Sequence, residues 1–176
     1  LDFDTEYCYQ LASEDGDGDE GPRSPTMCGY VLPPPHLTLI EKKFMENTGN
    51  GMLDGRENGW AIFKVVNDGR SPARELKPWL QPEDGTMTPS LKIDSVKTIP
   101  ILAVGDTAQI EFSIYAKLKI ESGERNFFFR VEEFSGMDLE PEPISFPTLK
   151  VTPPNLVVTD FAIDNEWGQH YVPNNE

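Results

Sequence analysis

The sequence is short of cations, and it has no long apolar run. Lysine and arginine number 15 against 30 aspartates and glutamates, which gives a formal net charge of −15. Neutralising phosphates takes lysine and arginine, so this deficit argues against a nucleic-acid-binding protein and against docking on an anionic membrane surface. The apolar runs are far shorter than the roughly 20 residues that cross a bilayer, so we expect no direct membrane insertion.

Histidine is also scarce, which limits the chemistry available to the chain. The two histidines are His36, next to a run of prolines, and His170 near the end. A Ser-His-Asp arrangement needs a histidine in a suitable place. No motif singles out a pair of carboxylates for glycoside chemistry among the 30 acidic residues. We therefore expect no catalytic residues and no enzyme activity.

The two cysteines, Cys8 and Cys28, stand alone rather than in a C-x-x-C pair. Two cysteines and two histidines in these positions do not supply a zinc site. We predict a disulfide, which would indicate an extracytoplasmic compartment: the cell surface, the periplasm or the secreted fraction. The alternative is two free thiols in a cytosolic chain. No signal peptide is visible and the first residue is Leu1, so we expect a piece of a longer protein.

What the sequence does contain is period-two alternation, with 16 prolines and 14 glycines that disfavour long helices. Alternation of this kind predicts half-buried strands. It is clearest at residues 59–66, 108–114 and 127–131, and weaker candidates lie at 37–44, 74–80, 91–101, 115–120 and 144–151. Clusters of Gly, Asn and Asp separate these segments. The pattern predicts an all-β, immunoglobulin-like antiparallel β-sandwich of about seven strands.

Two proline clusters, Pro33-Pro34-Pro35 and Pro153-Pro154, divide the chain. Proline fixes φ and cannot continue a strand ladder, so both clusters predict stiff joints between domains. We predict a partial hairpin over residues 1–33, the sandwich over 34–152, and the start of a second similar module over 153–176. The segments that follow the two joints resemble each other, which predicts an array of modules.

The first 33 residues resemble the last hairpin of a fibronectin type III domain. Residues 5–11 are similar to its penultimate strand, with Tyr7, Tyr9 and Leu11 on one face, and residues 24–31 are similar to the approach to its last strand. On this resemblance the two cysteines face each other across the hairpin.

The segment 49–57 reads G-N-G-M-L-D-G-R-E, and Ala61, Phe63 and Val65 follow at two-residue steps before Asn67-Asp68-Gly69. This order resembles the bacterial CARDB-like immunoglobulin modules. The resemblance implies a spacer or interaction domain of a surface, secreted or cell-envelope protein. Some members lie beside peptidases, including caspase-like ones.

We therefore predict a non-catalytic structural spacer or protein-interaction module of a large bacterial envelope, surface or secreted multidomain protein. Its partners would be other domains of the same chain or another envelope protein. Two alternatives stay open: a carbohydrate-binding module, and an accessory domain of a caspase-like peptidase.

The loop from Glu46 to Glu57 has part of the spacing of a calcium loop. Side chains with oxygen atoms occupy positions 1, 3, 5, 9 and 12 of that spacing, with Gly51 at position 6. They are Glu46, Thr48, Asn50, Asp54 and Glu57. Calcium is the only cofactor that the sequence suggests. The alternative is a plain turn in which Asn50 and Gly51 take positive φ.

Two further groups of residues are of interest. The acidic run 15–20 alternates carboxylates but lacks a closing acid, so we expect a solvated hairpin tip there. Trp60, Trp79 and Trp167 are either packing aromatics or stacking platforms for sugars. An exposed row of Trp and Tyr on one sheet would favour the sugar alternative. Phe128, between Phe127 and Phe129, needs cover from a neighbour or partner.

Overall fold

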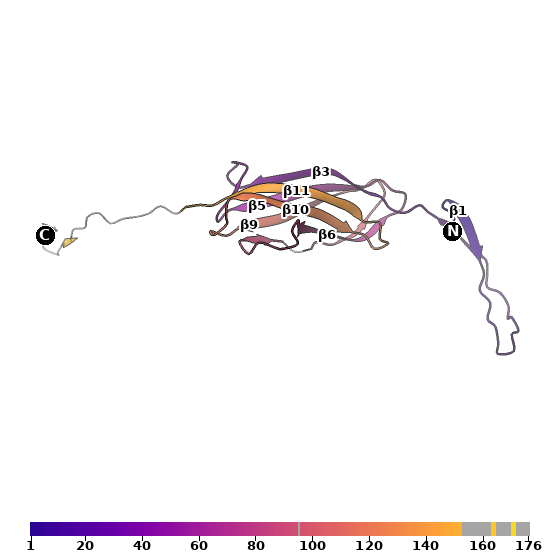
Figure 1. Ribbon diagram of the computed structural model, residues 1–176. Coiled ribbons are helices and arrows are strands. Elements are labelled where there is room, and N and C mark those ends of the chain that lie inside the picture. Colours follow the sequence, from indigo (N-terminus) through magenta and orange to yellow (C-terminus); the bar gives the residue numbers. More distant parts are fainter. Residues whose placement is uncertain (95, 153–162, 165–169, 172–176) are drawn as a thin grey trace.

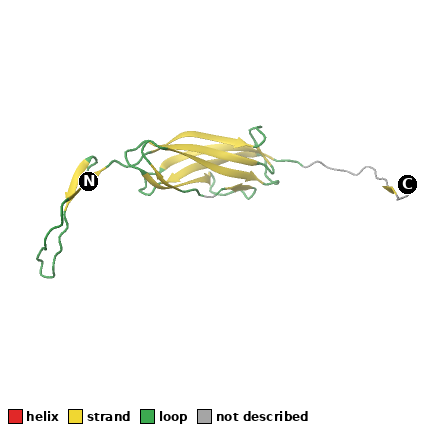
Figure 2. Cartoon of the chain, turned by 180° about the vertical axis from the view of Figure 1, so that it is seen from behind, coloured by secondary structure: helices red, strands yellow, loops and turns green. Residues whose placement is uncertain are grey.

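The computed structural model describes residues 1–94, 96–152, 163–164 and 170–171. Every regular element in these residues is a β-strand, as Figure 2 shows, so the predicted all-β fold is confirmed. Among the described residues, none belongs to a helix of the length and apolarity that crossing a membrane requires.

Two sheets packed face to face form the body of the molecule (Figure 1). The four-stranded sheet has the order β3 (Leu37–Glu46), β5 (Asn58–Asn67), β9 (Thr107–Ala116), β7 (Leu91–Ile93). The five-stranded sheet has the order β4 (Leu53–Asp54), β11 (Leu139–Leu149), β10 (Gly123–Glu132), β6 (Ala73–Pro82), β8 (Ile99–Leu102). The described part of the body thus has more strands than the seven predicted. Not all pairs are antiparallel, because β4 runs parallel to β11.

The predicted strand 91–101 is in fact two strands in different sheets. β7 pairs with β9, whereas β8 pairs with β6. Between them the Asp94 N–H donates to the Ser113 carbonyl of one sheet (3.0 Å), and the Lys97 N–H donates to the Pro78 carbonyl of the other (3.0 Å). The alternation of apolar and polar residues indicates which face of a strand is buried, but it does not indicate which sheet the strand joins. The sequence therefore could not show that this segment crosses from one sheet to the other.

Two other predicted strand boundaries are wrong. Residues 115–120 are the end of β9 followed by a turn, in which the Ile120 N–H donates to the Lys117 carbonyl (3.0 Å). The strand predicted at 144–151 begins earlier, at Leu139. Prolines within it hid the pattern, since proline is unusual in a strand unless the strand lies at a sheet edge.

A cluster of phenylalanine rings joins the two sheets at the centre of the core. Phe63 of β5 stacks on Phe129 of β10, with ring centroids 3.9 Å apart. Phe112 of β9 meets both rings edge-on, at 6.2 and 6.3 Å. All three lie in segments that alternation predicted to be strands, each at an apolar position of the alternating pattern.

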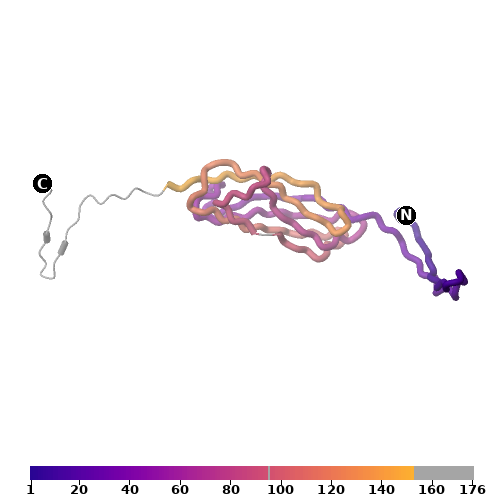
Figure 3. Tube along the Cα trace, turned by 60° about the horizontal axis from the view of Figure 1, so that its bottom comes forward, coloured from indigo at the N-terminus to yellow at the C-terminus, as the bar shows by residue number. Residues whose placement is uncertain are grey.

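The N-terminal residues form a separate hairpin of β1 (Thr5–Tyr9) and β2 (Met27–Val31), which lies beyond one end of the body (Figure 3). Cys8 and Cys28 are directly opposite each other, with Cα atoms 4.0 Å apart, and form the predicted disulfide. At the other end β12 (Ile163–Asp164) pairs with β13 (His170–Tyr171). The rest of the predicted second module lies outside the described residues.

Candidate functional site

The turn between β5 and β6 holds the proline joint that leads from the hairpin to the body. The Ser71 hydroxyl donates to the Pro33 carbonyl (2.6 Å), and the Arg70 N–H donates to the Pro34 carbonyl (3.4 Å). Two residues further along the linker, the Asp68 N–H donates to the His36 carbonyl (3.0 Å). The linker is therefore bonded to the body along its length and does not hang freely.

Asn67 organises this turn from within the protein. Its side chain is fully buried, at 0% exposure. The amide nitrogen donates to the carbonyls of Ser71 (2.9 Å) and Leu102 (3.0 Å), and the amide oxygen accepts from the N–H groups of His36 (3.3 Å) and Gly69 (3.1 Å). One side chain thus connects the linker, the turn and the last residue of β8. The sequence predicted a turn at this position but gave no sign that its asparagine is buried.

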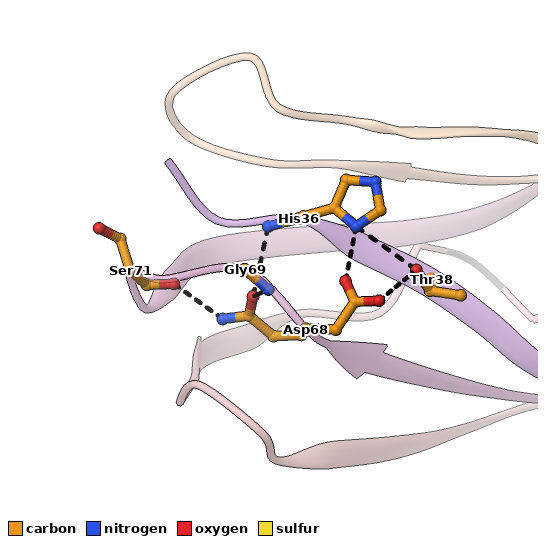
Figure 4. A network of polar contacts seen from close by, with 6 residues as sticks. His36, Thr38, Asp68, Gly69 and Ser71 are labelled. Carbon is orange, nitrogen blue, oxygen red and sulfur yellow. Dashed lines mark hydrogen bonds and ion pairs between the residues drawn. The ribbon is translucent and has the colours of Figure 1, made fainter. Parts of the chain in front are cut away.

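His36 adds a surface contact to the same joint, shown in Figure 4. Its Nδ1 lies 2.5 Å from an Asp68 carboxylate oxygen, and the Thr38 hydroxyl donates to the other oxygen (3.0 Å). Hydrogen bonds from His36 and Thr38 lower the pKa of Asp68. Thr38 and Asp68 both approach Nδ1, so the imidazole does not connect them through its two nitrogens as in a hydrolase triad.

One ion pair connects the hairpin with the body directly. The Arg70 guanidinium lies 2.6 Å from the Asp4 carboxylate, and both side chains are exposed. We name residues 33–36 and 67–71, together with this ion pair, the joint clamp.

The loop from Glu46 to Glu57 brings all five predicted calcium ligands into one hydrogen-bonded network. Glu46 accepts from the N–H groups of Gly51 (2.8 Å), Gly49 (2.8 Å) and Thr48 (2.5 Å), and also from the Thr48 hydroxyl (2.9 Å). These bonds, that from Gly51 above all, lower the pKa of Glu46 from 4.5 to about 2.

The closing acid of the loop is occupied in the same way. Glu57 is buried, at 6% exposure, and accepts from the N–H groups of Thr48 (3.0 Å) and Asp54 (2.7 Å). Asn50 donates to Asp54 (3.1 Å), while the second Asp54 oxygen is buried without a partner. In this loop Gly49, Gly51 and Arg56 have positive φ angles, whereas Asn50, for which the plain-turn alternative also expected one, does not.

These contacts bear on the calcium prediction without deciding it. Among the described residues, no group of three or more His, Cys, Asp or Glu is arranged so that it could hold a metal ion. Calcium binding at Glu46–Glu57 therefore stays a prediction. The plain turn is favoured because Glu46 and Glu57 already accept hydrogen bonds from backbone N–H groups of the loop. At the acidic hairpin tip, Asp15 accepts from the N–H groups of Asp17 and Asp19 (3.0 Å each), as a solvated turn would.

The tryptophans lie on different surfaces. Trp60 is half-exposed on the outer face of the four-stranded sheet, and Trp79 is half-exposed on the outer face of the five-stranded sheet. Phe128 shares the outer face with Trp79 and is also half-exposed. Tyr115, which the sequence analysis did not single out, shares the face of Trp60. Trp167 lies outside the described residues.

No family model and no curated protein matches the sequence. Similar solved structures include a family 123 glycoside hydrolase from Clostridium perfringens, with 12% identity, a TM-score of 0.43 and coverage of 58% of this chain and 23% of that one. The C-terminal domain of wzt is 14% identical with a TM-score of 0.47, over 84% of this chain and 80% of that one. At such TM-scores these likenesses carry no argument about function.

Proposed function

We propose that this chain is a stiff, non-catalytic spacer of an extracytoplasmic multidomain protein, with an immunoglobulin-like, CARDB-like body. The observation that carries the proposal is the joint clamp, because a spacer must fix the direction in which one module follows the next. Hydrogen bonds from Arg70 and Ser71 to consecutive linker carbonyls restrain a segment that proline already stiffens. The clamp also reaches past the linker to Asp4 of the hairpin.

Strand order supports the immunoglobulin-like assignment. The order β3-β5-β9-β7 corresponds to strands A-B-E-D of a constant-type immunoglobulin domain, and β11-β10-β6 corresponds to G-F-C. β8 then continues the second sheet beyond β6.

The disulfide supports a place outside the cytoplasm. Cys8 and Cys28 are exposed on a two-stranded hairpin, where cytosolic reductants would reach the bond. Such a hairpin has little stability of its own in water, so it depends on the disulfide. The disulfide can stabilise it only in a compartment that does not reduce the bond.

The test is ¹⁵N relaxation of the full chain, compared with Ser71→Ala and with Arg70→Ala. If the clamp stiffens the joint, the amides of β1 and β2 tumble with the body in the unchanged protein. They tumble faster than the body in both variants. Ser90→Ala is the control, since it removes another bond from a serine hydroxyl to a backbone carbonyl, that of Lys119 (3.3 Å), away from the joint.

Fast independent tumbling of the hairpin in the unchanged protein would contradict the spacer proposal. Equal tumbling in all four proteins would show that the clamp is not what stiffens the joint. Ser71→Ala leaves Asn67 in place, so the body is expected to stay folded, and its thermal unfolding checks this directly.

A further inference from the structure

β5, one of the two central strands of the four-stranded sheet, has apolar side chains on both faces, and its outer face also carries Asn58 and Lys64. Its inward side chains are core residues, whereas Trp60, Ile62 and Val66 point outward and are half-exposed. Met45, beside Trp60 on β3, is 50% exposed. The outer face of an antiparallel sheet is normally polar, so an apolar patch of this kind marks a surface that binds something. We name the outer face of this sheet the β5 face.

Strand register places two aromatic rings close together on the β5 face. Trp60 is directly opposite Ser113, and Tyr115 is two residues further along the same strand, so the two aromatics are diagonal neighbours. Diagonal neighbours are roughly 7–8 Å apart, within reach of aromatic side chains. Tyr115 is 36% exposed. An exposed row of Trp and Tyr on one sheet was the feature expected to favour carbohydrate binding, and the β5 face carries one half-exposed Trp and one exposed Tyr.

Hydrogen-bonding side chains surround the two rings. Asn58 and Lys92 are directly opposite Tyr115 on either side, and both are exposed, as is Ser113. Together they offer an amide, an ammonium and a hydroxyl around an aromatic surface. A few placed polar groups around apolar and aromatic side chains are the usual composition of a small-ligand site.

The charge of the β5 face favours an uncharged ligand. The β5 face carries three cations and two acids, which are Lys43, Lys64, Lys92, Glu41 and Glu111. The whole chain has 15 lysines and arginines and 30 aspartates and glutamates. Glu41 is paired with Lys43 (3.3 Å). The face is therefore near neutral, and the field of the whole molecule repels a polyanion.

The size of the face favours a narrow ligand over a protein partner. The 10 residues of β5 and the spacing of four strands give a flat area of roughly 34 Å by 14 Å, about 480 Å². A stable protein–protein interface buries about 800 Å² on each partner. A second copy of this chain would also bring another charge of −15 close to the first.

We propose that the β5 face binds a neutral polysaccharide. The C–H face of one pyranose ring stacks on Trp60 and that of another on Tyr115, because the electron-rich face of an aromatic ring attracts polarised C–H groups. Asn58, Ser113 and Lys92 bind the hydroxyl groups at the rims of the sugar rings. This site goes beyond the spacer role and shares no residue with the joint clamp, so either proposal can fail alone.

The experiment is affinity gel electrophoresis of the full chain in gels that contain laminarin, xyloglucan, galactomannan or alginate. We expect at least one of the three neutral polysaccharides to retard the unchanged protein, and alginate, a polyuronate, to leave its mobility unchanged. Trp60→Ala and Tyr115→Ala should each weaken the retarding interaction about tenfold or more, the usual effect of truncating an aromatic anchor.

Trp79→Ala is the matched control, because Trp79 is also half-exposed on an outer face but on the other sheet. It should keep full binding, and Trp60→Phe should keep part of it. Thermal unfolding of each variant separates loss of binding from loss of fold.

Four outcomes would overturn the proposal. They are no retardation by any neutral polysaccharide, equal retardation of Trp60→Ala and the unchanged protein, loss of binding in Trp79→Ala alone, or retardation by alginate alone. Light scattering that shows a dimer dissociated by Trp60→Ala would make the β5 face a protein interface instead.

Discussion

At the scale of single residues, this protein uses buried polar side chains to hold its loops. Glu133 accepts from the N–H of Arg74 (2.9 Å) and from Ser135, which attaches the turn after β10 to the start of β6. The Thr148 hydroxyl donates to the Glu121 carbonyl (2.8 Å) and so attaches β11 to the turn before β10. Together with Asn67 and Glu57, each of these side chains satisfies backbone groups that a loop would otherwise leave unpaired.

The low pKa of Glu46 leads to a prediction about acid stability. Its folded-state pKa of about 2 lies below the ordinary 4.5. The stabilisation is therefore fully present above pH 4.5 and is lost as the pH falls toward 2. Glu46→Gln should lower the melting temperature at pH 7, and its difference from the unchanged protein should shrink as the pH falls through this window.

Thermal unfolding across this pH range makes the measurement. Glu124→Gln is the control, because Glu124 is exposed and supports no loop. A Glu46→Gln difference as large near pH 2 as at pH 7 would show that the carboxylate charge is not what holds the loop.

At the scale of elements, the hairpin is the feature that the body supports least. One face of the hairpin is apolar and exposed, with Tyr9 and Met27 opposite each other. The disulfide holds these strands together where packing does not. The Glu46–Glu57 loop is held by its own hydrogen bonds to Glu46 and also by the body. Leu53 is fully buried, β4 pairs with β11, and the Arg56 N–H donates to the Ala116 carbonyl (2.8 Å).

Reduction of the disulfide should unfold the hairpin and leave the body intact. Two strands without a packed face are at best marginally stable in water, so β1 and β2 should lose their cross-strand contacts when the bond is broken. An NMR spectrum recorded after adding a reductant should show the amides of β1 and β2 at disordered shifts, with those of β5 and β10 unmoved. Movement of the β5 and β10 amides would mean that the hairpin and the body fold as one unit.

Calcium provides a second test at this scale. Glu46 and Glu57 already accept backbone N–H groups, so millimolar CaCl₂ should leave the melting temperature where EGTA leaves it. A ligand that binds only the folded state at 100 times its Kd adds about 2.7 kcal/mol, which such a scan detects. A rise with CaCl₂ that disappears in Glu57→Gln would establish the calcium site instead.

At the scale of the whole molecule, the open edges of the two sheets are protected against pairing with other chains. Outside β11 lies only the two-residue β4, which pairs with Thr148 and Leu149, and β11 has three prolines, Pro141, Pro143 and Pro147, that have no N–H to offer another strand. β3 has a register irregularity between Leu39 and Glu41, followed by charged residues. Both devices keep edge strands from adding a partner.

Restoring the missing donors should therefore promote association. Replacement of Pro141, Pro143 and Pro147 by Thr should give a protein that associates as its concentration rises, while the unchanged chain stays monomeric. Light scattering across a concentration series makes the measurement, with Thr148→Ser as a control that alters the same strand without adding a donor. A triple variant that stays monomeric would show that charge alone keeps the chains apart.

The sequence by itself determined the all-β class and which two cysteines could form a disulfide, because the first follows from local alternation and the second from there being two cysteines. Only the tertiary structure decided that residues 91–101 cross between sheets, that Asn67 is buried, and that Trp60 and Tyr115 share one face. Each of these depends on pairing between strands far apart in the sequence, and alternation within one strand carries no information about its partner. The Glu46–Glu57 loop lies between the two cases. Its residues were recognisable, but only the folded loop shows that their carboxylates are taken up by backbone N–H groups.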